Sequence, residues 1–397
     1  MKICIAGKNN IAVEVCAFIL EIYDPKDILI IPNRGDDGID KFQRSLLKFA
    51  KFHNLSVVTL EDIYSIDDLI FLSLEFDRII IPGKFKTKKL FNIHFSLLPE
   101  YKGMYTSVLP ILDNKAITGV TLHCIDSGID TGDIIAQKEI PILSHETSKS
   151  LYLKYIYEGV NLVVNNIDLI LSGKYISFPQ KNINSSYFSK KTINFSSIII
   201  DLNATAWQIY KQICAFNFRD YQLPNVMGYD IVGGDITTVK STLKPGILLE
   251  DKFHSITIST IDYNIILYKD KLNYLIEMCM IDDLNALLSV PNIKSYMRET
   301  ERLHGWNLLI ISAYHNSINI LKYLVENGFD INSQNFNGTT AIMYAKNAAL
   351  KTGDWALIRY MLSHKANPYL QDYSGKNLFD YLENESNELY TYIKNYD

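Results

Sequence analysis

Two short stretches of the sequence carry side chains that could move a proton and hold a developing charge. The first contains Asn92 and His94 in the run Asn-Ile-His-Phe-Ser-Leu-Leu-Pro, and the second contains Asp130 between Gly128 and Gly132. Residues two apart in a strand point to the same face, so Asn92 and His94 would lie side by side. A carboxylate on a glycine-flanked loop can converge with them. On spacing alone, a histidine that is hydrogen-bonded inside a core is the more common case, so the pattern needs support from the rest of the chain.

Residues 1–130 alternate strand-like runs with helix-like runs, and this order predicts the element that carries Asn92 and His94. The predicted strands are short, apolar and rich in β-branched side chains, over residues 3–6, 28–31, 56–59 and 78–81. Between them, residues 11–20 and 41–53 have helical spacing of apolar side chains. Alternating strands and helices indicate βαβ units and a parallel sheet, an α/β arrangement in which ligands bind beyond the carboxyl ends of the strands.

The loop Gly7-Lys8-Asn9-Asn10 follows the first predicted strand and opens a predicted helix. An anion can bind at such a helix N-terminus, which makes Asn9 a candidate substrate contact. The loop lacks the Gly-x-Gly-x-x-Gly pattern, so a dinucleotide site is not predicted. A plain turn explains these four residues equally well.

Beyond residue 150 the pattern indicates a second, smaller unit. Residues 150–172 predict a long helix that stops at Gly173, and a looser segment rich in Asn, Ser and Lys follows. Residues 204–216 then predict a helix, and residues 231–268 predict short strands separated by turns. Together these elements predict a small α+β domain.

The last third of the chain repeats itself. Gly305 and Gly338 open matching segments about one period of 33 residues apart, and a third start follows at Gly375. The pattern resembles ankyrin repeats. The expected fold class is therefore α/β with a Rossmann-like domain, a small α+β middle domain and C-terminal ankyrin repeats. The predicted boundaries are residues 1–190, 191–269 and 270–397.

Composition limits the class of protein further. A chain of 397 residues with 48% hydrophobic content can bury two or three cores. Its five cysteines form no Cys-x-x-Cys pair, so neither a disulfide framework nor a metal site is predicted. A net charge of −5 without long basic runs argues against nucleic acid as the main partner. The sequence shows no signal peptide and no apolar run of membrane-spanning length, so we expect a cytoplasmic protein without a membrane partner.

The two chemical motifs occur together at a separation that resembles a known family. Asn-x-His-x-Ser-Leu-Leu-Pro, followed by Gly-Ile-Asp-Thr-Gly, is similar to the formyltransferases that use N10-formyltetrahydrofolate as co-substrate. The resemblance covers about residues 1–180. It implies that the catalytic residues are Asn92, His94 and Asp130. It also implies that the folate pocket involves Ile81, Pro82, Gly83, Lys84 and Asp126.

The implied chemistry suits these residue types. An amine attacks the formyl carbon, a tetrahedral oxyanion forms, and the folate nitrogen leaves after gaining a proton. His94 could accept the proton of the amine. The amide N–H of Asn92 could donate to the oxyanion. Asp130 could orient the imidazole ring and stabilise its protonated form. His123, which is near in sequence, is expected to be a strand residue that faces a neighbour.

Two further segments resemble the branch of the family that formylates sugars. Around residues 100–107 the candidate substrate contacts are Tyr101, Lys102, Met104 and Tyr105. In residues 213–224 they are Phe218, Arg219 and Tyr221, where Arg219 could pair with a diphosphate and an aromatic ring could stack on a base. For each of the aromatic residues alone, ordinary packing is the more common explanation. Together the segments favour a nucleotide-linked amino sugar as substrate.

The tail narrows the expectation by resemblance alone. Ankyrin repeats after such a domain are similar to enzymes that formylate dTDP-3-amino-3,6-dideoxyhexoses for O-antigen and lipopolysaccharide synthesis. The family resemblance also implies a homodimer joined through the middle domain. Two alternatives stay open, a methionyl-tRNA formyltransferase and a non-catalytic interaction protein that presents ankyrin repeats.

The repeats themselves offer one further candidate, Trp306. It follows Gly305 on the predicted turn between repeats, where an exposed aromatic ring could bind a partner protein or a second nucleotide sugar. Packing of Trp306 against His304 or the neighbouring turn is the alternative. We expect the repeats to recognise a ligand without supplying catalytic groups.

Overall fold

The computed structural model describes residues 1–181, 183–383 and 385–396. The chain forms two compact units, and each is described by itself. The first contains Met1–Leu249 and Thr257–Leu267, and the second contains Glu250–Ile256 and residues from 268 onward. Within the described residues, no helix has the length and apolar character needed to cross a membrane.

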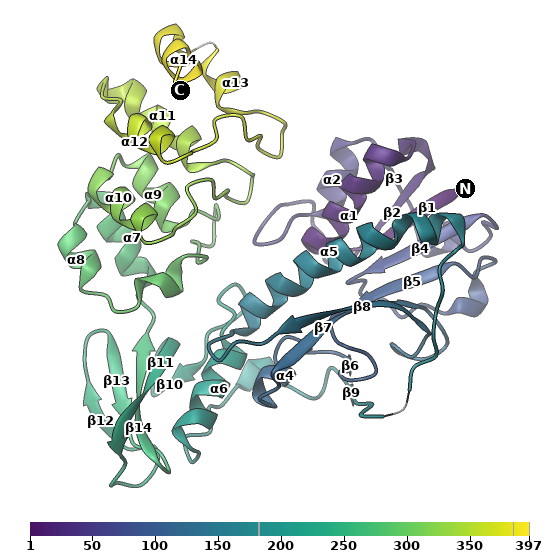
Figure 1. Cartoon of the computed structure of the whole chain (residues 1–397), viewed down its shortest axis with the longest axis horizontal. Helices are drawn as coiled ribbons and strands as arrows, with labels where there is room; N and C mark the ends of the chain where they lie inside the picture. The colour runs from purple at the N-terminus through teal and green to yellow at the C-terminus, as the bar shows by residue number, and fades with distance from the viewer. Residues whose placement is uncertain (182, 384, 397) are drawn as a thin grey trace. The chain divides into compact units, whose positions relative to one another are not determined.

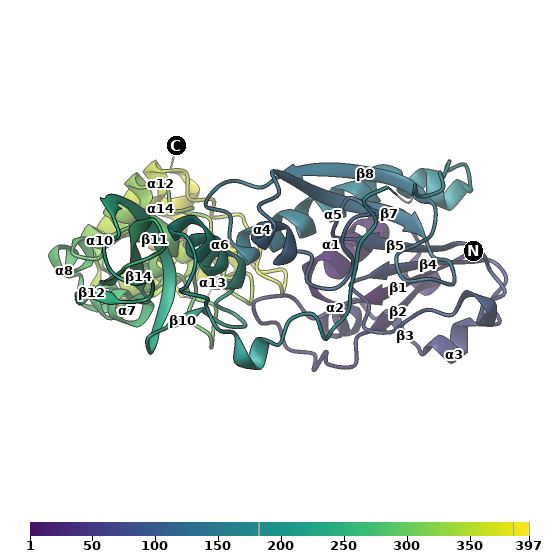
Figure 2. The ribbon, with the colours of Figure 1, turned by 90° about the horizontal axis from the view of Figure 1, so that it is seen from below.

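A seven-stranded sheet organises the first unit, with strand order β3-β2-β1-β4-β5-β7-β8. The first five of these strands run parallel, and β7 and β8 run antiparallel at one edge. Figure 2 shows them side by side in this order. Their bounds are β1 (Lys2–Gly7), β2 (Ile28–Pro32), β3 (Ser56–Val57), β4 (Leu69–Leu74), β5 (Leu90–His94), β7 (Ile117–Cys124) and β8 (Ile134–Pro141).

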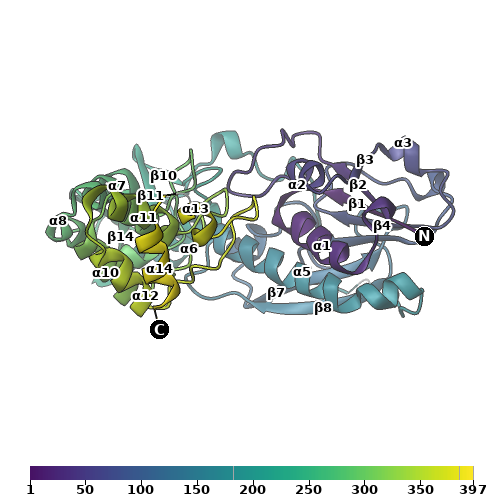
Figure 3. The same cartoon turned by 90° about the horizontal axis from the view of Figure 1, so that it is seen from above.

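Helices cover the sheet because alternate strand residues point to opposite faces. Ile3, Ile5 and their neighbours pack against α1 (Asn9–Ile22) and the long helix α5 (Ser148–Ser172), which contact each other. Figures 1 and 3 show these two helices next to each other. Cys4 and its neighbours pack on the opposite face, which includes residues of α3 (Leu60–Ile63). The expected Rossmann-like α/β domain is therefore confirmed.

One predicted strand is wrong. Residues 78–81 form no strand, whereas Leu69–Leu74, for which no strand was predicted, forms the central strand β4. All six side chains of β4 are buried, as expected for a strand covered on both faces. By contrast, the side chains of Ile79 and Ile81 are 73% and 55% exposed just before Pro82. Residues 69–74 and 78–81 have similar apolar composition, so composition alone does not predict which of the two segments is buried.

Helix boundaries follow the capping residues. The helix expected over residues 41–53 is shorter, α2 (Leu46–Phe52), because the Ser45 hydroxyl accepts a hydrogen bond from Lys48 N at 2.9 Å and caps the first turn. The long helix α5 ends as predicted, at Gly173 with a φ of +67°.

The middle part of the chain forms the expected helix and short strands. The helix is α6 (Ala206–Phe216), and the strands form one sheet in the order β10-β11-β14-β13-β12. Their bounds are β10 (Asn225–Val226), β11 (Tyr229–Lys240), β12 (Leu248–Asp251), β13 (Ser255–Ile258) and β14 (Tyr263–Lys269). The first unit also contains α4 (Leu109–Leu112) and two short strands, β6 (Lys102–Gly103) and β9 (Tyr187–Phe188), which pair with each other.

The second unit consists mainly of helices separated by recurrent turns. Gly305, Gly338 and Gly375 all have positive φ values, which the turns between repeats require. The helices are α7 (Leu272–Ile281), α8 (Leu284–Leu288), α9 (Leu308–Tyr314), α10 (Ile318–Glu326), α11 (Ala341–Thr352), α12 (Ala356–Ser363), α13 (Leu378–Leu382) and α14 (Asn387–Lys394).

The ring of Trp306 is not freely exposed, so that part of the expectation is wrong. It is half-buried, with ring centroids 4.8 Å from Tyr344, 5.0 Å from Tyr314 and 5.6 Å from His304. The ends of α9 and the first turn of α11 supply this aromatic packing. Trp306 Nε1 is buried and has no hydrogen-bond partner among the described residues.

Candidate active site

Strand β5 places Asn92 and His94 on one face, as the spacing predicts. The strand pairs with β7 so that Asn92 lies opposite His123 and His94 lies opposite Thr121. His94 is the last residue of β5 and is buried. It therefore lies at the carboxyl edge of the parallel strands, where ligands of such sheets bind.

The loop after β7 brings Asp130 to these two residues. The Asp126 carboxylate accepts hydrogen bonds from Gly128 N at 3.0 Å and from the Thr131 hydroxyl at 2.6 Å, which closes the turn. A side chain at Gly132 would lie 1.8 Å from the Cys124 carbonyl oxygen, so glycine is required there. Asp130 itself has a φ of +53°, an uncommon conformation that the surrounding contacts must hold.

The three predicted catalytic side chains meet. His94 Nδ1 lies 3.4 Å from Asp130 Oδ2, and Asn92 Nδ2 lies 3.4 Å from Asp130 Oδ1. Gly103 N donates a hydrogen bond to Asp130 Oδ2 at 2.9 Å. The carboxylate therefore contacts both other members of the triad and a backbone N–H.

Hydrogen bonding fixes which nitrogen of His94 can accept a proton. His94 Nε2 lies 2.8 Å from the Tyr101 carbonyl oxygen, and since a carbonyl only accepts, Nε2 carries the hydrogen. Nδ1 then has the free lone pair and faces Asp130. Burial lowers the pKa of His94, and the Asp130 carboxylate offsets this only in part. A neutral ring whose protonated form would lie beside a carboxylate suits a general base.

The carboxyl group of Asp130 is ionised at neutral pH. Burial alone would raise the pKa of this carboxyl, but the neighbouring imidazoles of His94 and His123 and the Gly103 N–H outweigh burial and lower the pKa to about 2. The group that stabilises a proton on His94 is therefore an anion over the range in which enzymes work.

The Asn92 amide is held by His123 and Asp130. His123 Nδ1 lies 2.8 Å from the Cys124 carbonyl oxygen and so carries a hydrogen, which leaves Nε2 to accept from Asn92 Nδ2 at 3.0 Å. Asn92 thus directs its N–H groups to His123 and Asp130. Donation to an oxyanion would require release of the longer 3.4 Å contact to Asp130. His123 is the strand residue that we expected, and it orients the Asn92 amide.

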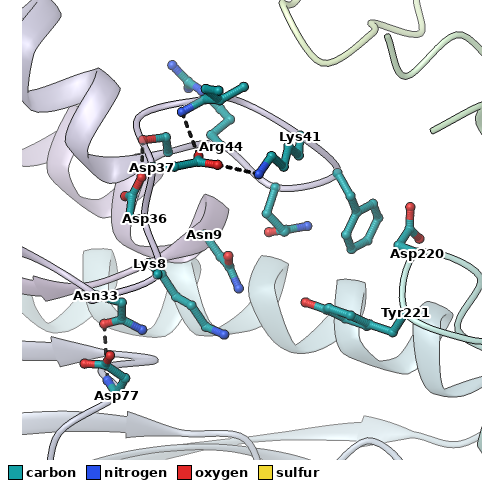
Figure 4. Close-up of a pocket in the computed structure, with 15 residues that line it drawn as sticks. Lys8, Asn9, Asn33, Asp36, Asp37, Lys41, Arg44, Asp77, Asp220 and Tyr221 are labelled. Carbon is teal, nitrogen blue, oxygen red and sulfur yellow. Dashed lines mark hydrogen bonds and ion pairs between the residues drawn. The ribbon is translucent and has the colours of Figure 1, made fainter. Parts of the chain in front are cut away.

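A cavity of about 500 Å³ opens at the carboxyl ends of β1, β2 and β4. Figure 4 shows Lys8, Asn9 and Tyr221 pointing into it. Lys8 Nζ has no hydrogen-bond or ion-pair partner among the described residues. The acidic groups around the cavity are already engaged: Asp36 with Ser45 and Leu47 N, Asp37 with Lys41, Asp77 with Arg34 N, and Asp220 with Lys149.

Of the three predicted contacts in residues 213–224, Tyr221 lines this cavity, whereas Phe218 and Arg219 do not. The side chain of Tyr221 is 61% exposed, whereas Phe218 belongs to the main core and packs against Tyr221 with centroids 4.7 Å apart. Arg219 is also buried.

The other predicted contacts occupy mixed positions. Tyr101 is buried, and its hydroxyl donates a hydrogen bond to the Asp113 carboxylate at 2.7 Å. Lys102 is buried with Nζ 3.2 Å from the Ser185 hydroxyl, and the Tyr105 hydroxyl donates to the Lys190 carbonyl at 2.7 Å. Their side chains therefore stabilise the loop, and Tyr101 reaches the site through its carbonyl. Among the predicted sugar contacts of residues 100–107, Met104 is exposed. Among the predicted folate contacts, the exposed residues are Ile81, Gly83, Lys84 and Asp126.

Sequence reasoning missed Glu75, which directly follows β4, and Tyr152 of α5. Their side chains hydrogen-bond to each other and to Asn9 at the carboxyl edge of the sheet. The buried apolar run Leu69–Leu74 was the available signal, because recognising it as a strand would have placed Glu75 at a ligand-binding edge.

Comparison with known proteins agrees with the class that the sheet and the three side chains define. The formyl transferase family matches residues 74–167, and the ankyrin repeat family matches residues 272–372 in three copies. These matches confirm both a formyltransferase domain and the repeats.

Solved structures identify the branch. The sugar 3N-formyl transferase WlaRD, solved with dTDP and 5-N-formyl-THF, is 46% identical to this chain and superposes with a TM-score of 0.64. The match covers 68% of this chain and 99% of the WlaRD chain. The N-formyltransferase from Helicobacter canadensis, solved with folinic acid and dTDP-3-aminofucose, is 44% identical with a TM-score of 0.64 and covers 68% and 100%. The chain belongs to the sugar N-formyltransferase family and is a formyltransferase.

A more distant relative comes from the tRNA branch. The methionyl-tRNA formyltransferase of Borreliella burgdorferi strain ZS7 is 28% identical over 233 residues, which are 55% of this chain and 72% of that protein. The higher identity and fuller coverage of the two sugar enzymes favour the sugar branch.

The site generates a prediction about pH. His94→Asn is expected to lower kcat by at least about 10²-fold, since proton transfer is lost, while tetrahydrofolate affinity stays unchanged. Because neutral His94 must accept the proton, kcat should fall only when the pH drops below its lowered pKa. In Asp130→Asn the carboxylate that raises this pKa is gone, so the acid limb should move to lower pH as the maximal rate falls. The pH profile of kcat measures both effects.

The exposed His145 provides the matched control, and His145→Asn should leave the profile unchanged. Retention of more than about a tenth of kcat in His94→Asn, or an acid limb that moves upward in Asp130→Asn, contradicts the assignment.

Proposed function

We propose that this enzyme transfers the formyl group of N10-formyltetrahydrofolate to the 3-amino group of a dTDP-linked 3-amino-3,6-dideoxyhexose, in the synthesis of O-antigen. One observation carries the proposal: the cavity of Lys8 and Tyr221 and the triad of His94 lie along the same carboxyl edge of the sheet. The two similar sugar enzymes, solved with dTDP or a dTDP-amino sugar, support the choice of substrate.

The separation of the two regions fits a nucleotide sugar. Strand β4 lies between β1, which precedes Lys8, and β5, which ends at His94. Two strand spacings amount to about 10 Å, which a pyranose ring and part of a diphosphate can span. A nucleotide in the cavity would thus extend its amine toward His94.

The cavity offers complementary chemistry for the nucleotide. The exposed ring of Tyr221 can stack on the base, and its loop is held by the ion pair between Lys149 and Asp220 at 2.9 Å. Lys8 supplies an ammonium without a partner among the described residues, which suits a diphosphate oxygen. We place Asn9 beside the hexose. The buried Arg219 supports this loop.

The proposed reaction begins when the lone pair of the amine attacks the formyl carbon and forms the new C–N bond. His94 Nδ1 accepts the proton released by the amine, and Asp130 stabilises the resulting imidazolium. The C–N10 bond then breaks, and the electron pair leaves on N10 with a proton, which gives tetrahydrofolate and the formamide. His94 is the group positioned to return that proton.

We propose that the folate lies against the loops on either side of β5. One is the exposed turn of Ile81, Pro82, Gly83 and Lys84, and the other is the turn closed by Asp126. Apolar side chains with a few backbone hydrogen-bonding groups suit a pterin. Met104 and Tyr105 directly follow Gly103, whose N–H contacts Asp130 of the second loop.

The nucleotide site gives a binding prediction. Tyr221→Ala should weaken dTDP about 10-fold or more, since one aromatic stack on a base contributes roughly 1–3 kcal/mol. Lys8→Ala should weaken dTDP more than it weakens thymidine, because only dTDP carries the diphosphate. Tyr157→Ala is the matched control, since Tyr157 is 65% exposed on α5 outside the cavity. Calorimetry that finds equal dTDP affinity in all three variants contradicts the site.

We also propose that the enzyme is a homodimer joined through the middle sheet. Edge strand β12 exposes Leu248 and Leu249, and β11 exposes Ile236 and Val239. Apolar side chains on an unpaired edge favour association. Light scattering of the full chain should give twice the chain mass, and the double variant Val239→Glu, Leu248→Glu should give a monomer. Val57→Glu, on exposed β3, is the control; a monomeric wild type contradicts the proposal.

Finally, we propose that the ankyrin repeats bind a second nucleotide sugar or a protein of the same pathway at Trp306. The unpartnered Nε1 of this half-buried ring supports a ligand that accepts a hydrogen bond. Calorimetry with dTDP-amino sugar should give two molecules per wild-type chain and one in Trp306→Ala, with Trp355→Ala as control. If wild type binds one molecule, the second-ligand option fails and only a protein partner remains.

A further inference from the structure

Glu75, Asn9 and Tyr152 form a closed hydrogen-bonded cluster between the cavity and the triad. Glu75 Oε2 accepts from the Tyr152 hydroxyl at 2.7 Å and from Asn9 Nδ2 at 3.1 Å. Asn9 Nδ2 also donates to the Tyr152 hydroxyl oxygen at 2.7 Å. The cluster therefore joins the start of α1, the end of β4 and helix α5.

The backbone at this cluster is held in an uncommon conformation. Glu75 and Asn9 have φ values of +56° and +65°, although neither is glycine. Asn33 Nδ2 donates to the Glu75 carbonyl at 2.9 Å, and Asn33 Oδ1 accepts from Asp77 N at 3.2 Å, which fixes the turn. A strained turn held by side chains indicates that the direction of Glu75 matters for function.

The atoms of the cluster that are left to bind a ligand are hydrogen-bond acceptors. The Tyr152 hydroxyl hydrogen and both Nδ2 hydrogens of Asn9 are engaged within the cluster. No hydrogen bond to Glu75 Oε1 or Asn9 Oδ1 occurs within the described part of the chain. A ligand that meets these two oxygens must therefore bring hydrogen-bond donors.

The ammonium of Lys8 favours the ionised form of the Glu75 carboxyl, and the Asn9 amide oxygen is a neutral acceptor. Burial raises the pKa of Glu75, while the ammonium of Lys8 and the hydrogen bonds from Tyr152 and Asn9 oppose that effect. Hydrogen bonds to a charged acceptor are roughly twice as strong as those between neutral groups. The cluster can thus discriminate between ligands that carry a donor and those that do not.

The sheet register places Glu75 between the two ends of the proposed substrate. Leu74 pairs with Gly7 on one side and with Ile93 on the other. Glu75 therefore follows β4 between Lys8, which follows β1, and His94, which ends β5. A hexose that reaches from the cavity to His94 must pass over this residue.

Resting on the proposed function, we infer that Glu75 Oε1 and Asn9 Oδ1 accept hydrogen bonds from a hexose hydroxyl next to the reacting amine, so that this cluster determines which amino sugar is formylated. The amine is the other donor on the ring. A carboxylate that held its ammonium form would raise the pKa of the amine and oppose the loss of the proton needed for attack. The hydroxyl is therefore the favoured occupant.

The test compares the amino sugar with its deoxy analogue, which lacks that hydroxyl. Wild-type kcat/KM should favour the hydroxyl-bearing sugar by roughly 10²-fold, the size of a hydrogen bond to a charged group. In Glu75→Gln, the orientation that keeps both bonds to Tyr152 and Asn9 turns the amide N–H₂ toward the sugar. The preference should then fall below about 10-fold. The loss should come from the hydroxyl-bearing sugar, while kcat/KM for the deoxy analogue stays within about threefold.

Two further variants distinguish loss of the hydrogen bond to the sugar hydroxyl from a general disturbance of the fold. Glu21→Gln, exposed on α1, should keep the full preference. Tyr152→Phe leaves Glu75 Oε1 in place and should reduce the preference less than Glu75→Gln does. An equal reduction in both variants, or a preference retained in Glu75→Gln, overturns the inference. If instead wild type releases no tetrahydrofolate with any nucleotide amino sugar, the proposed function fails first.

Discussion

The carboxylate of Asp130 is the group on which the geometry of the reaction centre depends. It faces His94 on one oxygen and Asn92 on the other, and it accepts the backbone N–H of Gly103. Burying a carboxylate costs free energy, yet His94, His123 and the Gly103 N–H lower its pKa to about 2, so they more than offset the effect of burial. A lowered pKa means that the contribution of Asp130 to stability is present above the ordinary range of an aspartate and is lost as the pH falls through about 2.

The contacts of the Asp130 carboxylate constrain the backbone of the loop that carries it. Asp130 reaches the site from a left-handed conformation, in a turn where a side chain at Gly128 would lie 2.0 Å from the Thr131 hydroxyl oxygen. Gln180 then donates to the carbonyl groups of Asp130 and Gly132 at 2.9 and 2.8 Å. The glycines of the motif are thus explained by close packing of the loop, and the aspartate by its charge.

How much of this could be predicted depends on how local each feature is. The triad and the repeats could be predicted because fixed spacings encode them. The cluster of Glu75 and Tyr152 could not, since those residues are far apart in sequence and meet only after β4 is placed correctly. Phe218 and Tyr221 show the same limit: composition marks both as aromatic, but only packing decides that one enters the core and the other faces a cavity.

Burial disfavours the charged form of His94, Asp130 and Glu75 alike, yet the two carboxyls end with pKa values shifted in opposite directions because their partners differ. Asp130 has two imidazoles and a backbone N–H, which favour its anion and lower its pKa. Glu75 has a phenol, an amide and one more distant ammonium, which do not overcome burial, and its pKa is raised. His94 is penalised by burial when charged, so it stays ready to accept a proton. Two carboxylates at one sheet edge are thereby fitted to different tasks, one to stabilise a transient cation and the other to accept hydrogen bonds from a neutral ligand.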